Sequence, residues 1–309
     1  MPSGTAERTG NHHTAQRWAG FLRSCGHRVT IEEEWGGAGV DALIALHARK
    51  SAHSVERFHR EYAERPLIVA LTGTDLYRDI ETSAEARRAL DVATRLVVLQ
   101  PQGRTRLAPS LRPKTRVIFQ SSDTRLTHRP SKKRFRIVVV GNLRDEKDPF
   151  RAATALARLP SHPGIEVVQI GASLAPEMKR AARRFERHDP RYAWIGSQPH
   201  GEALRRMAAS HLLVVSSVME GGANVICEAS RIGVPVLASR VSGNIGMLGA
   251  GYAGYFPLFD DRKLARLIER ASGDKAFYAK LKQAVSVRRA LFAPSAEKGG
   301  LQRLLREFA

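Results

Sequence analysis

The chain has 309 residues, of which 43% are hydrophobic and 26% charged, and its net charge is +20. This composition is typical of a globular protein long enough for two domains, and it excludes a disordered chain. No apolar stretch is long enough for a membrane-spanning helix, and residues 1–10 lack the apolar core of a secretory signal. The two cysteines, Cys25 and Cys227, show no metal-ligand spacing, which fits a reducing cytoplasm, the predicted location.

The excess of positive charge raises the question of nucleic-acid binding. Most basic residues are arginines on the outer faces of predicted helices such as 178–188, and the basic run 132–136 has no interleaved exposed aromatics. This pattern favours solvated helix faces and anionic small-molecule substrates over a specific nucleic-acid partner. A basic nucleic-acid-binding module is kept as an alternative hypothesis.

Strands and helices alternate through the first half of the chain. A helix is predicted over 11–26, and apolar runs predict strands at 27–33, 41–47, 66–73, 95–100 and 116–121. Before the first helix there is only the Gly-containing stretch 4–15, where a doubly wound domain normally has a strand. Either the chain starts late or this half has a reduced sheet. The stretch resembles the loop that follows such a strand, which favours a late start.

The second half repeats the alternation after a polar, proline-bearing linker at 122–133. Asp148-Pro149 predicts a helix start with Asp148 as N-cap, and Gly233 predicts a helix stop. Predicted strands cover 135–141, 165–171, 192–196, 212–217 and 234–239, and predicted helices cover 148–159, 175–188, 201–209, 224–233, 275–292 and 300–308. This order predicts an α/β fold with two doubly wound parallel-sheet domains.

In such domains ligands bind beyond the carboxyl ends of the strands. The segments expected there are short and polar, and they would face one another across an interdomain cleft: 46–50, 71–75, 99–103, 140–147, 195–200, 216–224 and 238–244.

Residues 220–228, EGGANVICE, join a predicted strand to a predicted helix. The glycines Gly221 and Gly222 let the backbone pass close to a ligand. Free N–H groups at the helix start, near Ala223 and Asn224, would face an anion such as a diphosphate.

The same segment carries two carboxylates around this phosphate cradle. Glu228, one turn into the helix, can accept two hydrogen bonds from a vicinal diol such as ribose, and Glu220 can do the same for a hexose. Together they predict a nucleotide-sugar site. The alternative is two surface acids around a loop.

These residues resemble the nucleotide-sugar-binding half of retaining glycosyltransferases with two facing Rossmann-like domains, the GT-B architecture. The E-x7-E motif of that family matches Glu220 and Glu228, which implies contacts to the sugar hydroxyls and the ribose respectively. The resemblance also implies a last helix that returns to the first domain. We therefore expect an acceptor domain at 1–125, completed by a helix at 287–309, and a nucleotide-sugar-binding domain at 126–286.

A second motif of this family, G-R-L-x-x-x-K, resembles residues 141–147. Gly141 and Lys147 match it, and Lys147 would reach the diphosphate. Asn142 replaces the usual arginine, and Arg144 is the candidate substitute. An ordinary exposed lysine is the alternative for Lys147.

Three stretches indicate a more specific family among these glycosyltransferases: ALIALHARKSAHSVERF at 42–58, PLIVALTGTDLYRDI at 66–80 and VGNLRDEKDPFRAA at 140–153. They are similar to the selenosugar synthases of selenoneine biosynthesis, and the similarity covers most of the chain. It implies transfer of a hexosyl or N-acetylhexosaminyl group from a UDP-sugar to selenophosphate, with a C–Se bond and a 1-selenosugar as product. The absent first strand departs from the family pattern.

Selenophosphate is a small polyanion, so its site needs cations and N–H donors. The first half offers such groups at a helix start and at two strand ends: Gly10, Asn11, His12, Arg49, Lys50, Thr72, Gly73, Thr74 and Arg78. The selenium nucleophile is already anionic, so catalysis would depend on positioning and on stabilising the departing diphosphate.

We predict three catalytic residues, His47, Asp75 and Glu220. The alternatives are a hydrogen-bonded histidine for His47 and a helix N-cap for Asp75. The predicted donor site comprises Gly141, Arg144, Lys147, Ser197, Glu220, Gly221, Gly222, Ala223, Asn224 and Glu228. The segment of Ser197, 195–201, is either a uracil-binding loop or a plain one.

The sequence has no D-x-D motif and no Cys/His pairing with ligand spacing, so we expect no cofactor and metal-independent transfer. A UDP-sugar enzyme with another small acceptor, such as an organic alcohol, a thiol or water, is the main alternative. An organic acceptor would call for an apolar pocket and a competent base, whereas the segments predicted here are mostly cationic.

Overall fold

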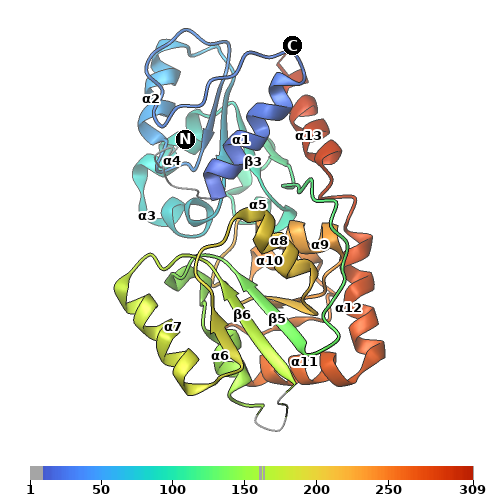
Figure 1. The fold of residues 1–309 in the computed structure, drawn as a ribbon. Helices are drawn as coiled ribbons and strands as arrows, with labels where there is room; N and C mark the ends of the chain where they lie inside the picture. The colour runs from blue at the N-terminus through green and yellow to red at the C-terminus, as the bar shows by residue number, and fades with distance from the viewer. Residues whose placement is uncertain (1–9, 160–161, 163, 309) are drawn as a thin grey trace. The chain divides into compact units, whose positions relative to one another are not determined.

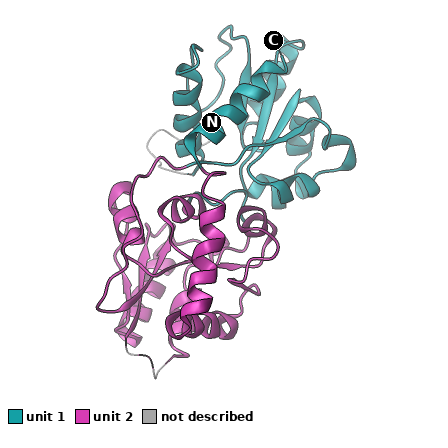
Figure 2. Cartoon of the chain, turned by 90° about the vertical axis from the view of Figure 1, so that its right-hand side faces the viewer, with its two compact units in different colours: residues 1–121, 220–224, 293–309 teal, residues 122–219, 225–292 magenta. Residues whose placement is uncertain are grey.

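The computed structural model of the chain describes residues 10–159, 162 and 164–308. The chain divides into two compact units (Figure 2). Unit 1 comprises residues 1–121, 220–224 and 293–309, and unit 2 comprises residues 122–219 and 225–292. The segment 287–309 therefore contributes to both units, since unit 2 continues to residue 292.

Unit 1 is built on a parallel sheet whose strand β3 is labelled in Figure 1. The sheet has four strands in the order β1-β2-β3-β4. The strands are β1 (Leu43–Leu46), β2 (Leu67–Leu71), β3 (Arg95–Val98) and β4 (Thr115–Val117). The helices are α1 (Gly10–Arg23), α2 (Ala52–Glu61), the π-helical turn η1 (Asp75–Asp79), α3 (Ile80–Thr82), α4 (Ala84–Val92), α5 (Pro101–Thr105), the 3-10 turn η2 (Pro109–Leu111) and α13 (Pro294–Arg306).

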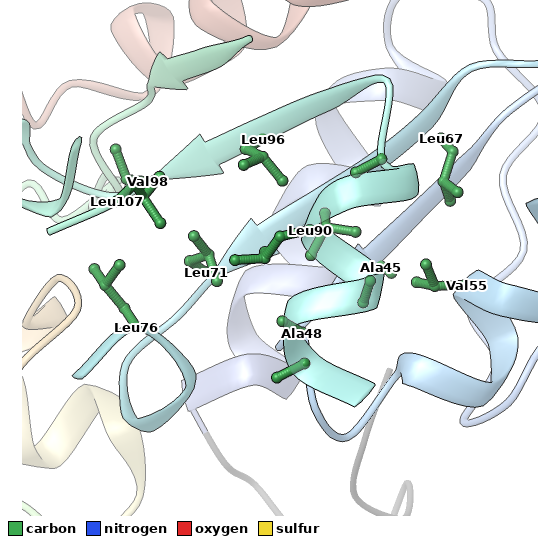
Figure 3. Close-up of a cluster of buried hydrophobic side chains, with 14 of the residues drawn as sticks. Ala45, Ala48, Val55, Leu67, Leu71, Leu76, Leu90, Leu96, Val98 and Leu107 are labelled. Atoms are coloured by element: carbon green, nitrogen blue, oxygen red, sulfur yellow. The ribbon is translucent and has the colours of Figure 1, made fainter. Parts of the chain in front are cut away.

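Strand β2 is buried along its whole length because helices cover both faces of the sheet. Leu67, Val69 and Leu71 pack in one apolar cluster with side chains of α2 and α4 (Figure 3). Ile68 and Ala70 pack on the other face with side chains of α1 and α13. Successive side chains of a strand point to opposite faces, so a continuous apolar run is what a central parallel strand requires.

Unit 2 contains a six-stranded parallel sheet in the order β10-β9-β8-β5-β6-β7. The strands are β5 (Phe135–Val140), β6 (Ile165–Ile170), β7 (Tyr192–Trp194), β8 (Leu212–Val215), β9 (Val236–Ser239) and β10 (Tyr255–Phe256). The helices are the 3-10 turn η3 (Asp145–Lys147), α6 (Arg151–Leu156), α7 (Pro176–His188), α8 (His200–Ala208), α9 (Asn224–Ile232), α10 (Ser242–Leu248), α11 (Asp261–Gly273) and α12 (Lys275–Val287).

The predicted α/β architecture with two parallel sheets is confirmed. The predicted helix stop at Gly233 is also confirmed, because Gly233 has φ +94° and its amide closes the last turn of α9 on the Ala229 carbonyl at 2.7 Å. Residues 10–42 contain no strand, so β1 is the first described strand of unit 1. Residues 4–9 of the predicted first loop lie outside the described residues.

Two local predictions are wrong. Residues 27–33 are not a strand: Val29 and Ile31 alternate as in a strand, but both are only half-buried and no described strand pairs with the segment. Asp148 is not an N-cap, because α6 begins at Arg151 and Phe150 precedes it. Asp148 instead adopts a left-handed conformation with φ 43°, and its carboxylate accepts a bond from the Arg151 Nε at 2.7 Å.

Candidate functional site

Two adjacent loops of unit 2 are joined at the carboxyl ends of β5 and β6. The Asn142 side-chain oxygen accepts a bond from the Ala172 amide at 3.1 Å, and the Leu143 amide donates to the Ala172 carbonyl at 2.8 Å. Asn142, which occupies the position of the motif arginine, therefore holds one loop to the next. Gly141 precedes it, and Arg144 follows in an exposed position.

The backbone around Lys147 is attached to the loop that follows β8. The Ser216 hydroxyl donates to the Lys147 carbonyl at 3.1 Å and to the Asp148 carbonyl at 2.8 Å, and the Val218 amide donates to the Glu146 carbonyl at 2.9 Å. The parallel sheet order places β5 beside β8, so these two loops leave the same edge of the sheet. These bonds hold the backbone of Lys147, the residue predicted to bind the diphosphate, in place.

Glu228 lies on α9 with 13% of its side chain exposed, and it has a partner that the sequence analysis missed. The His200 Nε2 lies 2.8 Å from the Glu228 Oε1. The hydrogen bond to this carboxylate raises the pKa of His200 above its ordinary value. His200 is the first residue of α8 and lies within the predicted uracil-binding segment 195–201, whose Ser197 is exposed. The sequence signal that could have identified His200 was its position three residues after Ser197.

Residues 220–222 form the EGG turn, and its two glycines lie against other segments of unit 1. A Cβ at Gly221 would collide with the Thr72 carbonyl oxygen and would lie 2.7 Å from the Gly73 amide nitrogen. A Cβ at Gly222 would lie 2.6 Å from the Cβ of Leu99. The close approach of these neighbouring segments of the same chain is therefore one reason why both positions are glycine. Their approach to a ligand stays a prediction.

The other predicted residues of the turn lie in the same surroundings. Glu220 is 7% exposed and Ala223 is 3% exposed. A Cβ at Gly10, the first residue of α1, would lie 4.0 Å from the Asn224 Nδ2. Unit 1 thus brings the predicted donor turn next to the loop 72–74 and the start of α1, where Asn11 and His12 are both half-buried.

Asp75 is fully buried and organises the predicted acceptor loops. Its carboxylate accepts bonds from the amides of Ala48, Thr72, Gly73 and Leu76 at 2.7–3.2 Å. Ala48 and Leu76 themselves belong to the apolar cluster beneath the site (Figure 3). These bonds give Asp75 a loop-organising role, whereas its predicted catalytic role stays a prediction.

His47 directly follows β1 and has an unusual backbone conformation, with φ 76°. The imidazole is 4% exposed, and its Nε2 lies 2.9 Å from the Thr74 Oγ1. Burial lowers the pKa of His47, against the opposing effect of Asp75. Burial therefore favours the neutral form of this histidine.

The predicted cations beside His47 surround Asp79, a carboxylate that the sequence analysis did not single out. Asp79 Oδ2 accepts a bond from the Arg49 Nε at 3.0 Å, and Asp79 Oδ1 accepts one from the Arg78 Nε at 3.4 Å. The Asp79 side chain is 5% exposed, while those of the two arginines are 45% and 49% exposed. Lys50 is also exposed. Asp79 follows Asp75 by four residues, a spacing that was the signal available.

Neither a metal-binding cluster nor a membrane-spanning helix is found among the described residues. No group of three or more His, Cys, Asp or Glu side chains in this part of the chain is arranged to hold a metal ion. No helix within the same residues is long and apolar enough to cross a bilayer.

Comparison with known proteins gives one family match. A family model described as "Glycosyl transferases group 1" matches residues 122–287, more than half of the chain. This segment contains β5 to β10 and therefore the whole sheet of unit 2.

Solved structures resemble the chain beyond that segment. HepE from Anabaena in complex with UDP and glucose is 18% identical, with a TM-score of 0.72 over 86% of this chain and 78% of that chain. HepE in complex with UDP-glucose gives a TM-score of 0.71 at 18% identity, over 86% and 79% of the two chains. Sucrose-phosphate synthase from Thermosynechococcus elongatus is 18% identical, with a TM-score of 0.73 over 98% of this chain and 81% of that chain.

Proposed function

The chain belongs to the glycosyl transferases of group 1 and has the GT-B fold, and on this premise we propose that it moves a glycosyl group from a UDP-sugar to selenophosphate. The group would be a hexosyl or N-acetylhexosaminyl group, and the product a 1-selenosugar of the selenoneine pathway. The donor half of this proposal has support from the fold, and the acceptor half rests on the resemblance of residues 42–58 and 66–80.

The observation that carries the donor assignment is the geometry of Glu228. A largely buried carboxylate with one oxygen bonded to His200 is fixed in orientation, and its oxygens still have acceptor capacity for the two hydroxyls of a ribose. HepE, which has a similar fold, was solved with UDP-glucose bound. Lys147 would neutralise the diphosphate, and Glu220 would accept from the sugar hydroxyls.

The remaining donor contacts follow from the same loops. Main-chain N–H groups of the turn and of the motif segment would face the diphosphate, with Arg144 as a further cation. The proposed donor site comprises Gly141, Arg144, Lys147, Ser197, Glu220, Gly221, Gly222, Ala223, Asn224 and Glu228.

The proposed reaction forms one bond at the anomeric carbon and breaks another. The selenium of selenophosphate donates an electron pair to this carbon, and the bond to the UDP oxygen breaks, so UDP leaves with its electron pair. Water then cleaves the Se–P bond, which releases inorganic phosphate and the 1-selenosugar. No metal takes part in this scheme, because Lys147 and arginines would stabilise the departing diphosphate.

The test is turnover of several UDP-sugars with selenophosphate, with products identified by mass. We expect UDP and a selenium-containing sugar to form in equal amounts, and a chelator to leave the rate unchanged. Parallel reactions with thiophosphate, with small alcohols and thiols, and with water alone test the alternative acceptors. UDP release with one of these but not with selenophosphate would overturn the acceptor assignment and leave the donor assignment intact.

A further inference from the structure

The hydrogen bonds around His47 determine which ring nitrogen carries the proton. The Lys50 amide donates to the His47 Nδ1 at 3.4 Å, so this nitrogen is an acceptor. A ring whose Nδ1 accepts a hydrogen bond carries no proton there, and the neutral imidazole then has its single N–H on the other nitrogen. The proton is therefore on Nε2, which donates to the Thr74 Oγ1 at 2.9 Å.

This bond sets the role of the Thr74 hydroxyl. Because the hydroxyl oxygen accepts from His47, its own hydrogen points elsewhere and is available to donate. Thr74 precedes η1, but its side chain does not cap that turn. The neighbouring Asp75 carboxylate is already occupied by main-chain amides. Thr74 is half-buried at the surface of the loop.

Asp79 aligns two cations beside this hydroxyl. Its buried carboxylate binds the Nε atoms of Arg49 and Arg78, while both guanidinium groups remain about half exposed. An arginine fixed in this way loses less side-chain entropy when it binds a phosphoryl oxygen. Asp79 Oδ2 also lies 3.7 Å from the His47 Nε2, the same atom that lies 2.9 Å from the Thr74 Oγ1.

The backbone of His47 supports a functional reason for this arrangement. A φ of 76° is uncommon for a residue other than glycine and indicates backbone strain. The strained conformation is kept by main-chain bonds on both sides, from the His47 amide to the Ala70 carbonyl at 2.8 Å and from the Ser51 amide to the His47 carbonyl at 3.0 Å. Such strain persists mainly at active and binding sites.

We propose that Thr74, Arg49 and Arg78 form a binding site for a tetrahedral oxyanion, in which the Thr74 hydroxyl donates to the anion. His47 and Asp79 are positioning residues: His47 orients the hydroxyl from Nε2, and Asp79 orients the guanidinium groups. His47 is not a general base in this arrangement, because the nitrogen nearest to Thr74 already carries the proton. The inference rests on the proposed function in taking the phosphoryl group of the acceptor as the bound anion.

The first test measures binding of inorganic phosphate to the whole chain by calorimetry. Thr74→Val keeps the shape of the side chain but removes the hydroxyl, and we expect it to weaken phosphate binding about tenfold or more. Thr74→Ser is the matched control and should bind phosphate within about twofold of the wild type. UDP affinity should be unchanged in both variants, which shows that they are folded. Equal phosphate affinity in all three proteins would overturn the proposal.

The second test needs no substitution at Thr74. Nitrogen-15 NMR of the wild-type imidazoles should show His47 as the Nε2–H tautomer, and a proton on Nδ1 would overturn the proposed orientation. In kinetics, His47→Ala should raise the KM for the acceptor. His47→Gln retains a hydrogen-bond donor and should restore most of the wild-type KM. If His47 were a base, both variants would lose kcat alike, together with the acid limb of the pH profile. Asp75, Asp79, Arg49 and Lys50 surround the ring, so each variant is compared over the whole pH range.

These outcomes separate the site from the reaction. Phosphate binding and the tautomer are measured without turnover, so a chain that transfers nothing to selenophosphate, yet passes both tests, contradicts the proposed function alone. Selenophosphate turnover with an unaltered phosphate affinity in Thr74→Val contradicts the site alone.

Discussion

Glu228 and Glu220 are separated by seven residues, but they should contribute to different parts of donor binding. Glu228→Ala should weaken UDP binding about tenfold or more, because a charged hydrogen bond contributes about 1.5–3 kcal/mol. Glu220→Ala should leave UDP affinity unchanged and weaken the complete UDP-sugar. Glu202→Ala is the control, since Glu202 pairs with Arg205 and Arg206 on its own helix, α8. Calorimetric titration of each variant checks this, and equal UDP affinity in all of them would contradict the motif assignment.

His200 should make stability depend on pH through its bond to Glu228. The pKa of His200 is raised in the folded state, so the bond stabilises the fold below the ordinary pKa of histidine and is lost as the pH rises through the raised value. The wild type should therefore have a higher free energy of unfolding than His200→Gln, and this difference should be larger at pH 6 than at pH 9. The difference should stay below about 1 kcal/mol, because more than half of the His200 side chain is exposed.

Urea unfolding at several pH values measures this dependence, and His128 supplies a control of opposite sign. Burial lowers the pKa of His128, so its contribution is complete above the ordinary pKa of histidine and is lost as the pH falls. His128→Gln should therefore change the pH slope in the other direction. A difference between wild type and His200→Gln that does not vary with pH would show that the pair is not coupled to folding.

At the scale of elements, the EGG turn is constrained by the loop after β2. Gly221→Ala should destabilise the protein by about 1–3 kcal/mol, because its Cβ would overlap the Thr72 carbonyl and the backbone must move. Gly20→Ala is a matched control on α1, where an added Cβ meets nothing within 4 Å. It should stabilise the helix by about 0.5–1 kcal/mol. Chemical unfolding checks both, and a Gly221→Ala protein as stable as the wild type would exclude the close packing.

The helical and strand elements themselves were predictable wherever the local pattern agrees with burial. The run 66–73 predicted a buried strand, and β2 occupies Leu67–Leu71. The pattern at 27–33 is just as regular, but its apolar residues have no neighbouring strand, and a strand exists only with a partner to bond. Asp148 has the chemistry of an N-cap, yet its nearest partner is the Arg151 side chain.

At the scale of the whole molecule, the first and last helices of the chain close unit 1. Glu297 on α13 is fully buried and accepts bonds from the Arg17 Nε at 2.7 Å, the Trp18 Nε1 at 2.7 Å and the Ser121 amide at 2.8 Å. These partners lie more than 170 residues away in sequence. One carboxylate therefore joins the two chain ends to the end of the segment 1–121.

Glu297→Ala should lower the free energy of unfolding by about 3 kcal/mol, because it leaves Arg17 and Trp18 without their buried acceptor. Glu307→Ala should cost about 1 kcal/mol or less, since Glu307 pairs with Arg95 and Arg116 at the surface. Urea unfolding of both variants compares two C-terminal carboxylates directly. Similar losses would mean that Glu297 is not the contact that closes the unit.

The sequence by itself determined the fold class and the segments that bear the candidate site. Apolar runs and their breakers depend on neighbours within about ten residues, so strand β5, the loop 141–147 and the segment 220–228 could be recognised locally. The motif at Glu220 and Glu228 also lies within a single strand–turn–helix segment. Its chemistry, two carboxylates around glycines, needs no distant residue to be recognised.

Only the tertiary structure decided which groups become partners. His200 meets Glu228 across 28 residues, Arg49 meets Asp79 across 30, and Arg17 meets Glu297 across 280. It also decided that Asp75 is enclosed by main-chain amides and that Gly221 lies against the Thr72 carbonyl. The physical reason is that a buried polar group must find its partner wherever the packing of the core brings one, and that distance in space is not encoded in local periodicity.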